Sequence, residues 1–283
     1  MFIKIFRPAF AAALAALFCL GSAFAQEGPL RKEDPKGVTA DQIIQQFAAK
    51  EKEFRAAWEK YVYREDIKVE TLDGDTPNGE FRLVYDVVFN DQGKRQESVV
   101  FAPASTLQSI SMTQEDYDQM QNIVPFSLTS DDLPKYQILY AGMQKEDELE
   151  TYVFDVAPKQ IVKGQRYFQG RIWVDSKDLQ IVLTKGKLVP ETRDPKGKKD
   201  ENLFPDYTTY REQIDGQYWF PTYSRADQVL HFARAGDVHM RSVIKFSNYR
   251  RFGSDVKIQY GGQEVQKSPG APAATPPQQK PPR

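Results

Sequence analysis

The stretch FQGRIWVDSKDLQIV, residues 168–182, decides the fold of this chain. Apolar and polar residues alternate up to Asp175, a polar segment follows, and an apolar run resumes at Ile181. The alternation predicts two faces, with Phe168, Gly170, Ile172 and Val174 on one and Arg171, Trp173 and Asp175 on the other. The stretch therefore predicts two antiparallel strands joined by a tight turn.

The same period of two extends through most of the chain on both sides of this hairpin. It predicts strands at 61–72, 80–90, 95–104, 137–145, 149–158, 166–175, 180–189, 206–214, 217–231, 238–252 and 256–261. Nearly all the links between them are short, and short links join antiparallel neighbours. We therefore expect a mainly β fold, in which about eleven antiparallel strands curl into a half-open barrel.

Helical patterns occur at two places. Thr39 and Gln42 have the spacing of a capping box at a helix N-terminus. The residues that then recur on one helical face are Ile43, Phe47, Phe54, Trp58 and Tyr61. A second, short helix is expected as an insertion that is capped by Thr113 and ends near Asn122. We expect this insertion and the N-terminal amphipathic helix to cover the concave face of the sheet.

Composition and charge exclude several classes of protein. The chain has 283 residues, with 38 Lys and Arg against 39 Asp and Glu, so its formal net charge is −1. This balance gives no broad basic field for nucleic acid, and nucleic-acid binding is not expected. The mean hydropathy of −0.59 argues against a protein with several membrane spans. An aromatic content of 12% is too high for a disordered chain.

The N-terminus has the features of a secretory signal peptide. Lys4 and Arg7 precede an apolar run, and Ala23 to Ala25 form a small-x-small cleavage site, so we expect residues 1–25 to be removed after Ala25. The single cysteine, Cys19, would leave with this segment, which excludes disulfides and thiolate metal sites in the mature protein. We expect a periplasmic protein with no transmembrane segment after cleavage. Its predicted parts are a flexible N-terminal linker at 26–38, one folded domain at 39–262 and a disordered proline-rich tail at 263–283.

No catalytic or metal-binding motif stands out. The acidic turn at 146–150 has the character of a solvated loop, and a hairpin turn explains Asp73 and Asp75 as well as a calcium site does. His231 and His239 flank the turn near Gly236. A two-residue turn would send them to opposite faces, and a three-residue loop would place them opposite each other. Two histidines are too few for a stable zinc site, and we predict no catalytic residue, metal or cofactor.

The hairpin at 168–182 resembles the Gly-x-hydrophobic-Trp-hydrophobic-Asp hairpin of the lipoprotein-carrier superfamily. That superfamily includes the LolA/LolB-type outer-membrane lipoprotein-sorting proteins and the RseB/MucB-type periplasmic regulators. The order of elements is similar over residues 39–261, helix first and strands after. The resemblance implies a half-open barrel closed by helices, an apolar cavity that takes acyl chains, and no catalysis.

The residues also point to an apolar concave surface, because one helix cannot cover all the aromatic side chains expected there. The candidate lining residues are Phe47, Phe54, Trp58, Leu83, Tyr85, Phe89, Tyr152, Phe154, Phe168, Ile172, Met240 and Phe246. The first hypothesis is a periplasmic carrier of lipid or lipoprotein acyl chains, with an acylated lipid or lipoprotein as partner. The second is a non-enzymatic envelope sensor that binds a protein partner through a sheet edge or through the basic stretch Lys185–Lys199.

Overall fold

The computed structural model describes residues 27–90, 92–122, 125–191, 202–252, 259–260 and 263–264. The predictions of a signal peptide at 1–25 and of disorder over most of 263–283 lie outside these residues. In chain order the elements are α1 (Ala40–Trp58), β1 (Tyr61–Asp73), β2 (Thr76–Phe89), β3 (Arg95–Phe101), α2 (Gln114–Asn122), the 3-10 helix η1 (Leu133–Lys135), β4 (Tyr136–Glu146), β5 (Leu149–Pro158), β6 (Tyr167–Asp175), β7 (Ile181–Val189), β8 (Tyr207–Gln213), β9 (Trp219–Phe232), β10 (Gly236–Arg251), β11 (Gln259–Tyr260) and β12 (Gln263–Glu264).

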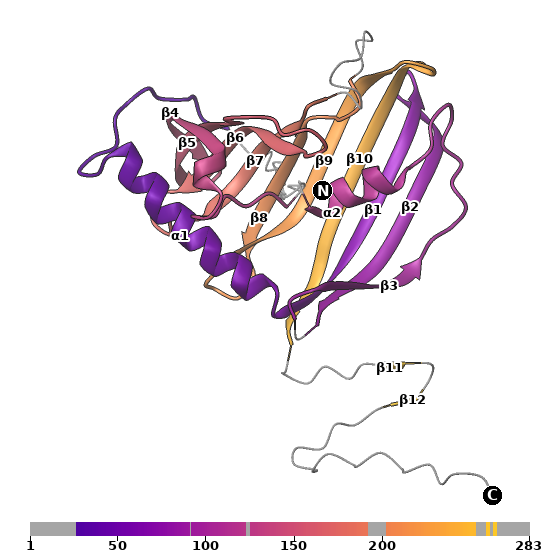
Figure 1. Cartoon of the computed structure of the whole chain (residues 1–283), viewed down its shortest axis with the longest axis horizontal. Coiled ribbons are helices and arrows are strands. Elements are labelled where there is room, and N and C mark those ends of the chain that lie inside the picture. The colour runs from indigo at the N-terminus through magenta and orange to yellow at the C-terminus, as the bar shows by residue number, and fades with distance from the viewer. Residues whose placement is uncertain are drawn as a thin grey trace, which may run out of the picture.

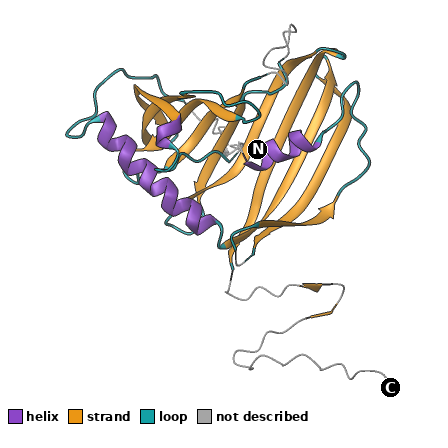
Figure 2. Cartoon of the chain, in the orientation of Figure 1, coloured by secondary structure: helices purple, strands orange, loops and turns teal. Residues whose placement is uncertain are grey.

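One open antiparallel sheet dominates the fold. Its ten strands have the order β3-β2-β1-β10-β9-β8-β7-β6-β5-β4, so β3 and β4 form the two edges. The sheet is strongly curled, and α1 and α2 lie on the same side of it (Figures 1 and 2). The predicted class, a mainly β half-open barrel with an N-terminal helix, is confirmed. The eleventh predicted strand differs: its described part, β11, pairs with β12 in a separate two-stranded sheet.

Helix α1 begins as its sequence predicts. Thr39 accepts a hydrogen bond from the backbone N–H of Gln42 at 3.2 Å, and the Gln42 side chain accepts one from the Thr39 N–H at 2.9 Å. The helix ends at Trp58, so Tyr61 does not continue the helical face as predicted. Tyr61 is instead the first residue of β1, because the chain has already turned away from the helix axis at Glu59 and Lys60.

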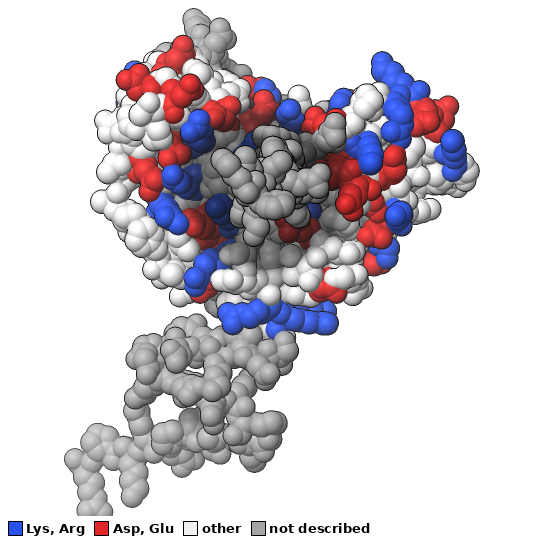
Figure 3. All heavy atoms as spheres, turned by 180° about the vertical axis from the view of Figure 1, so that it is seen from behind, with Lys and Arg blue, Asp and Glu red and all other residues white. Residues whose placement is uncertain are grey.

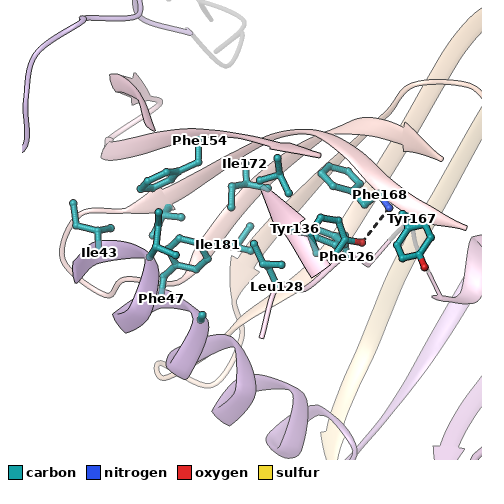
Figure 4. Packing of buried hydrophobic residues seen from close by; sticks show 14 of the residues in the cluster. Ile43, Phe47, Phe126, Leu128, Tyr136, Phe154, Tyr167, Phe168, Ile172 and Ile181 are labelled. Atoms are coloured by element: carbon teal, nitrogen blue, oxygen red, sulfur yellow. Dashed lines mark hydrogen bonds between the residues drawn. The ribbon is translucent and has the colours of Figure 1, made fainter. Parts of the chain in front are cut away.

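The inner face of β4–β7 and the first half of α1 bury each other. Figure 4 shows the helix side chains Ile43 and Phe47 pointing toward Phe154, Ile172 and Ile181 on the strands. The Phe47 and Phe154 rings are 5.5 Å apart between centroids. The link between α2 and η1 adds Phe126 and Leu128 to the same cluster. This cluster fixes α1 across one half of the concave face.

The β6–β7 hairpin has the two faces that the alternation predicts. Phe168, Ile172 and Val174 lie in the inner cluster with α1. Trp173 lies on the opposite, outer face, where it packs with Val153 in a separate apolar cluster and donates a hydrogen bond to Gln144 at 2.9 Å. The sheet is therefore apolar on both faces at β5–β7.

The β4 edge is covered by the chain itself. Residues Glu27 and Arg31 form antiparallel bridges with Glu146 and Met143 of β4, and the Arg31 backbone exchanges hydrogen bonds of 2.8 and 2.9 Å with Met143. These residues belong to the segment 26–38 that was predicted as a flexible linker. In the structure the part from Glu27 to Arg31 runs along β4 as an added edge segment.

The outer face carries charged residues of both signs. Three arginines make two-point contacts with aspartates on neighbouring strands, and these pairs are Arg64–Asp86, Arg82–Asp66 and Arg171–Asp155. Figure 3 shows acidic and basic side chains interspersed over the face seen from behind. Such a surface is typical of a solvated sheet face, since it presents no large field of one sign.

The two histidines take neither of the predicted arrangements. Phe232 pairs with Gly236, which places His231 opposite Asp237 and His239 opposite Val229. His231 hydrogen-bonds to Asp237 and His239 to Asp227, each at 2.6 Å. Both predicted pairings were wrong because the loop of three residues ends before Gly236 rather than at it.

Candidate apolar binding site

An apolar pocket lies between α2 and the inner face of the sheet at β6–β10. Its lining residues are Ile110, Ser111, Met112, Asp116, Met120, Phe168, Thr184, Gly186, Lys187, Leu188, Leu203, Phe204, Pro205, Tyr207, Thr209, Phe232 and Met240. The cavity measures about 70 Å³, roughly twice the volume of about 30 Å³ that a water molecule occupies in the liquid. Three methionines border it, and their unbranched side chains adapt readily to a changed shape.

One wall of the pocket is α2 with the residues just before it. Thr113 caps this helix as predicted, because its hydroxyl accepts a hydrogen bond from the Asp116 N–H at 3.3 Å. Tyr117 packs on Phe81 of β2, with 5.6 Å between ring centroids, and Met120 is buried in the cluster on β1, β2, β9 and β10. The remaining described side chains of α2 are polar, so a single stripe holds the helix to the sheet.

Arg166 connects the walls at the rim of the pocket. Its guanidinium donates to Glu115 of α2 at 2.9 Å and to the carbonyl of Pro190 after β7 at 2.5 Å. The same group lies over the ring of Phe204, 4.8 Å from the centroid. One side chain therefore ties together α2, the end of β7 and the segment before β8.

The floor of the pocket carries hydroxyl groups. Thr184 of β7 is paired in register with Thr209 of β8, which is paired with Ser224 of β9. The Thr209 and Ser224 hydroxyls are hydrogen-bonded at 2.9 Å. Tyr207 also lines the floor, and burial raises its pKa to about 12, so it stays a neutral phenol at physiological pH. The pocket thus has mainly apolar walls, with Asp116 and Lys187 as its charged residues, and a few uncharged polar groups at its base.

A buried ion pair fixes α1 beside this site. Arg211 of β8 donates to both carboxylate oxygens of Glu51 on α1, at 3.0 and 3.1 Å, and Glu51 also accepts the Ile181 N–H at 3.1 Å. Both side chains are almost completely buried. Burial raises the pKa of Glu51, while the facing guanidinium of Arg211 opposes this rise. Because Arg211 also donates to the Phe126 carbonyl, the pair joins four segments: α1, β7, β8 and the link between α2 and η1.

A second buried charge lies toward the β3 edge and does not line the pocket. Arg95 of β3 donates to Glu65 of β1 at 2.8 Å and to the Tyr63 hydroxyl at 2.7 Å. Its guanidinium lies 5.5 Å from the centre of the Tyr85 ring. Burial raises the pKa of Glu65 above its usual value. These contacts hold the edge strand β3 to β1 across β2.

The twelve residues predicted to line a cavity are spread over the whole concave face of the sheet. Of the candidates, Phe168 and Met240 line the pocket. The others lie in the packed clusters beside it: Phe47, Phe154, Ile172 and Tyr152 with α1, Tyr85, Phe246, Leu83, Phe89 and Trp58 on the β1–β2–β10 side, and Phe54 with Tyr61 and Phe220. The pocket and these clusters share the same sheet face.

The sequence did not identify most of the residues that form the walls of the pocket. Leu203, Phe204 and Pro205 fall in what the sequence presents as a loop, and Met112 precedes the short helix. The apolar run from Leu203 to Pro205, set between charged segments, is the signal that could have identified the first group. Of the predicted basic stretch, the described residues Lys185 and Lys187 lie on β7, and residues 192–199 lie outside the described residues.

Within the described part of the chain, no group of three or more His, Cys, Asp or Glu side chains could hold a metal ion. No helix among the described residues is long and apolar enough to cross a membrane. The acidic turn at 146–150 contains one perturbed group, since burial raises the pKa of Glu146 to about 7.

No family model and no curated protein matches the chain. A DUF1329 family protein from Desulfovibrio piger is a structural neighbour with 16% identity and a TM-score of 0.37, over 75% of this chain and 93% of that one. A LolA superfamily protein from Nitrosomonas europaea has 14% identity and a TM-score of 0.34, over 77% and 96%. MucB in the MucA/MucB complex of Pseudomonas aeruginosa has 9% identity and a TM-score of 0.23, over 75% and 99%.

These similarities are low, with every TM-score below 0.5, so we base all functional proposals on the geometry of this chain. The LolA-type and MucB-type names, which stand for the two groups that the hairpin at 168–182 resembles, occur among these neighbours.

Proposed function

We propose that this protein is a non-enzymatic carrier that binds an acyl chain of a lipid or lipoprotein in the pocket under α2, within the periplasm. The observation that supports this most directly is the lining of the pocket, which is mainly apolar and has hydroxyl groups at its base, with Asp116 and Lys187 as its charged residues. An acyl chain gains about 0.8 kcal/mol for each CH₂ that leaves water. A pocket of this chemistry therefore favours aliphatic chains over charged or strongly polar ligands.

The cavity of about 70 Å³ is too small for a long chain, so binding requires one wall to move. Helix α2 is the wall that can do so at least cost, because Tyr117 and Met120 supply its apolar contacts with the sheet. The opposite side of the concave face, under α1, is held by the buried Glu51–Arg211 pair and is expected to stay in place.

The test is uptake of a fluorescent fatty acid by the mature chain and by two tryptophan variants. Met240→Trp replaces the methionine side chain with a larger indole ring in the pocket and is expected to weaken uptake at least tenfold. Val229→Trp is the matched control, because Val229 is an exposed residue of β9, the strand next to Met240, and does not line the pocket. Equal uptake by the wild type and Met240→Trp would contradict binding at this site.

A second candidate function is a sensor that binds an envelope protein through a sheet edge. One observation favours it: Val99, Val100 and Phe101 on the edge strand β3 are 64%, 50% and 49% exposed. An exposed apolar edge strand offers pairing groups to another chain. A photo-crosslinking amino acid at Val99 would then give one defined adduct in cells, and Phe101→Lys would abolish it. Absence of any adduct would count against this function.

A further inference from the structure

A surface loop between β5 and β6 lies beside the mouth of the pocket. We call it the 159–166 loop, and its residues from Lys159 to Gln165 are all exposed. It begins where the Lys159 N–H donates to the carbonyl of Lys135 at 2.8 Å. It ends at Arg166, the residue that contacts Glu115 and Phe204 at the rim of the pocket. Any surface that binds this loop is therefore brought close to the pocket mouth.

The chemistry of the 159–166 loop is unusual for a solvated turn. Its sequence, KQIVKGQR, contains three cations and no acidic residue. Ile161 and Val162 sit next to each other and are 47% and 45% exposed. A hydrogen bond of 3.1 Å from the Gln165 N–H to the Val162 carbonyl closes the turn behind them. Two aliphatic side chains thus project from a turn with a lysine on each side.

This combination complements an anionic lipid surface. Aliphatic side chains gain free energy when they enter the boundary between headgroups and acyl chains, and neighbouring lysines gain about 1 kcal/mol each near anionic lipids. An acidic protein surface would satisfy Lys159 and Lys163 but would leave Ile161 and Val162 in contact with polar groups. A bilayer satisfies both pairs of residues at once.

We propose that the 159–166 loop docks this protein on anionic bilayers, with Ile161 and Val162 inserted at headgroup level and Lys159 and Lys163 against lipid phosphates. The proposal extends the acyl-carrier function, because docking through this loop sets the pocket mouth against the source of acyl chains. Arg166 then stands between the bilayer and the pocket.

Co-flotation with vesicles tests the docking. The mature full chain is mixed with vesicles of phosphatidylcholine, with or without phosphatidylglycerol, and we expect flotation with the anionic vesicles that is lost in high salt. Lys159→Gln/Lys163→Gln is expected to weaken partitioning about 30-fold, from about 1 kcal/mol for each cation and 1.4 kcal/mol for each factor of ten. Ile161→Ser/Val162→Ser is expected to abolish flotation.

The matched control removes two cations elsewhere. Arg250→Gln/Arg251→Gln changes exposed residues at the end of β10, where Phe252 is also exposed, and it is expected to float as the wild type does. A wild-type chain that stays with the lipid-free fraction overturns the proposal. Equal losses in the loop variant and the β10 variant overturn it as well, because binding would then follow net charge rather than this loop.

A fluorescent reporter gives a second measurement that does not depend on a loss of binding. Val162→Trp places an indole at the tip of the loop, and its emission is expected to shift to the blue and to be quenched by brominated lipid. A chain that floats with vesicles while this indole remains unquenched would overturn insertion of the loop.

The docking and carrier proposals can fail separately. Met240→Trp should lose fatty-acid uptake and still float with vesicles, whereas Ile161→Ser/Val162→Ser should stop floating and still take up soluble fatty acid. Flotation without any fatty-acid uptake would refute the carrier function and leave the docking proposal standing.

Discussion

The buried pair between Glu51 and Arg211 gives the sharpest prediction about what holds the site in place. Arg211→Met keeps much of the side-chain volume but leaves the Glu51 carboxylate, which is completely buried, with the Ile181 N–H as its remaining hydrogen-bond donor. Removing one partner of a buried ion pair costs about 3–5 kcal/mol. Because whole domains are stable by about 5–15 kcal/mol, this one change should remove roughly a fifth or more of the free energy of unfolding.

The loss should depend on pH in a defined direction. Without Arg211, burial raises the pKa of Glu51 further, so the folded variant holds a proton that the unfolded chain releases at neutral pH. The folded state then binds more protons than the unfolded state, and the free energy of unfolding falls as pH rises above the ordinary glutamate pKa. Arg211→Met should therefore be closer to the wild type at pH 5 than at pH 8.

Urea unfolding followed by circular dichroism at both pH values measures this effect. Glu51→Gln added to Arg211→Met is the control: it removes the ionisable group and should recover part of the stability at pH 8 and abolish the pH dependence. A destabilisation by Arg211→Met below about 1 kcal/mol, or one that is equal at pH 5 and pH 8, would refute the view that this pair is a buried charge clamp.

Three further changes test other parts of the structure. Burial raises the pKa of Glu146 to about 7, so the folded state loses stability as the pH rises from about 4.5 to 7. Glu146→Gln should therefore raise the free energy of unfolding at pH 8 by about 1 kcal/mol, a value reduced because the side chain is partly exposed. An equal gain at pH 4 would contradict this. Gly186→Ala should lower the melting temperature, because a Cβ there would lie 2.4 Å from the Gln169 carbonyl oxygen. Such overpacking costs about 1–3 kcal/mol of stability. An unchanged melting curve would contradict the close approach of β6 and β7. Thr39→Ala removes the cap bonded to Gln42 and should cost about 1 kcal/mol in urea unfolding, whereas no loss would mean that the α1 terminus is stabilised otherwise.

The sequence was sufficient to predict those parts of the fold that depend on local patterns. Alternation predicted β5 as residues 149–158, and the structure places it at Leu149–Pro158. The capping residues Thr39 and Thr113 were identified because a cap is made by side chains three residues from their partners. The inner position of Phe168 and the outer position of Trp173 follow from the period of the strand alone.

The contacts that build the site are non-local, which is why the sequence could not predict them. Glu51 and Arg211 are separated by 160 positions. A glutamate among polar helix residues is expected to face solvent, because the sequence does not show that the strand carrying Arg211 packs against it. Arg166 looks like one more loop cation, although it ties α2 to the end of β7. The candidate cavity residues were chosen for being apolar on the inner face, a property that core and pocket residues share.

Native mass spectrometry of the mature protein, purified from its own envelope without detergent, tests the acyl-carrier account most directly. The wild-type protein is expected to carry an added mass that corresponds to an acylated lipid or to a lipoprotein acyl group. Met240→Trp purified in parallel is expected to lack this mass, and Val229→Trp to retain it. A wild-type protein that is free of ligand and takes up no fatty acid, or a ligand that Met240→Trp holds equally well, would contradict the account.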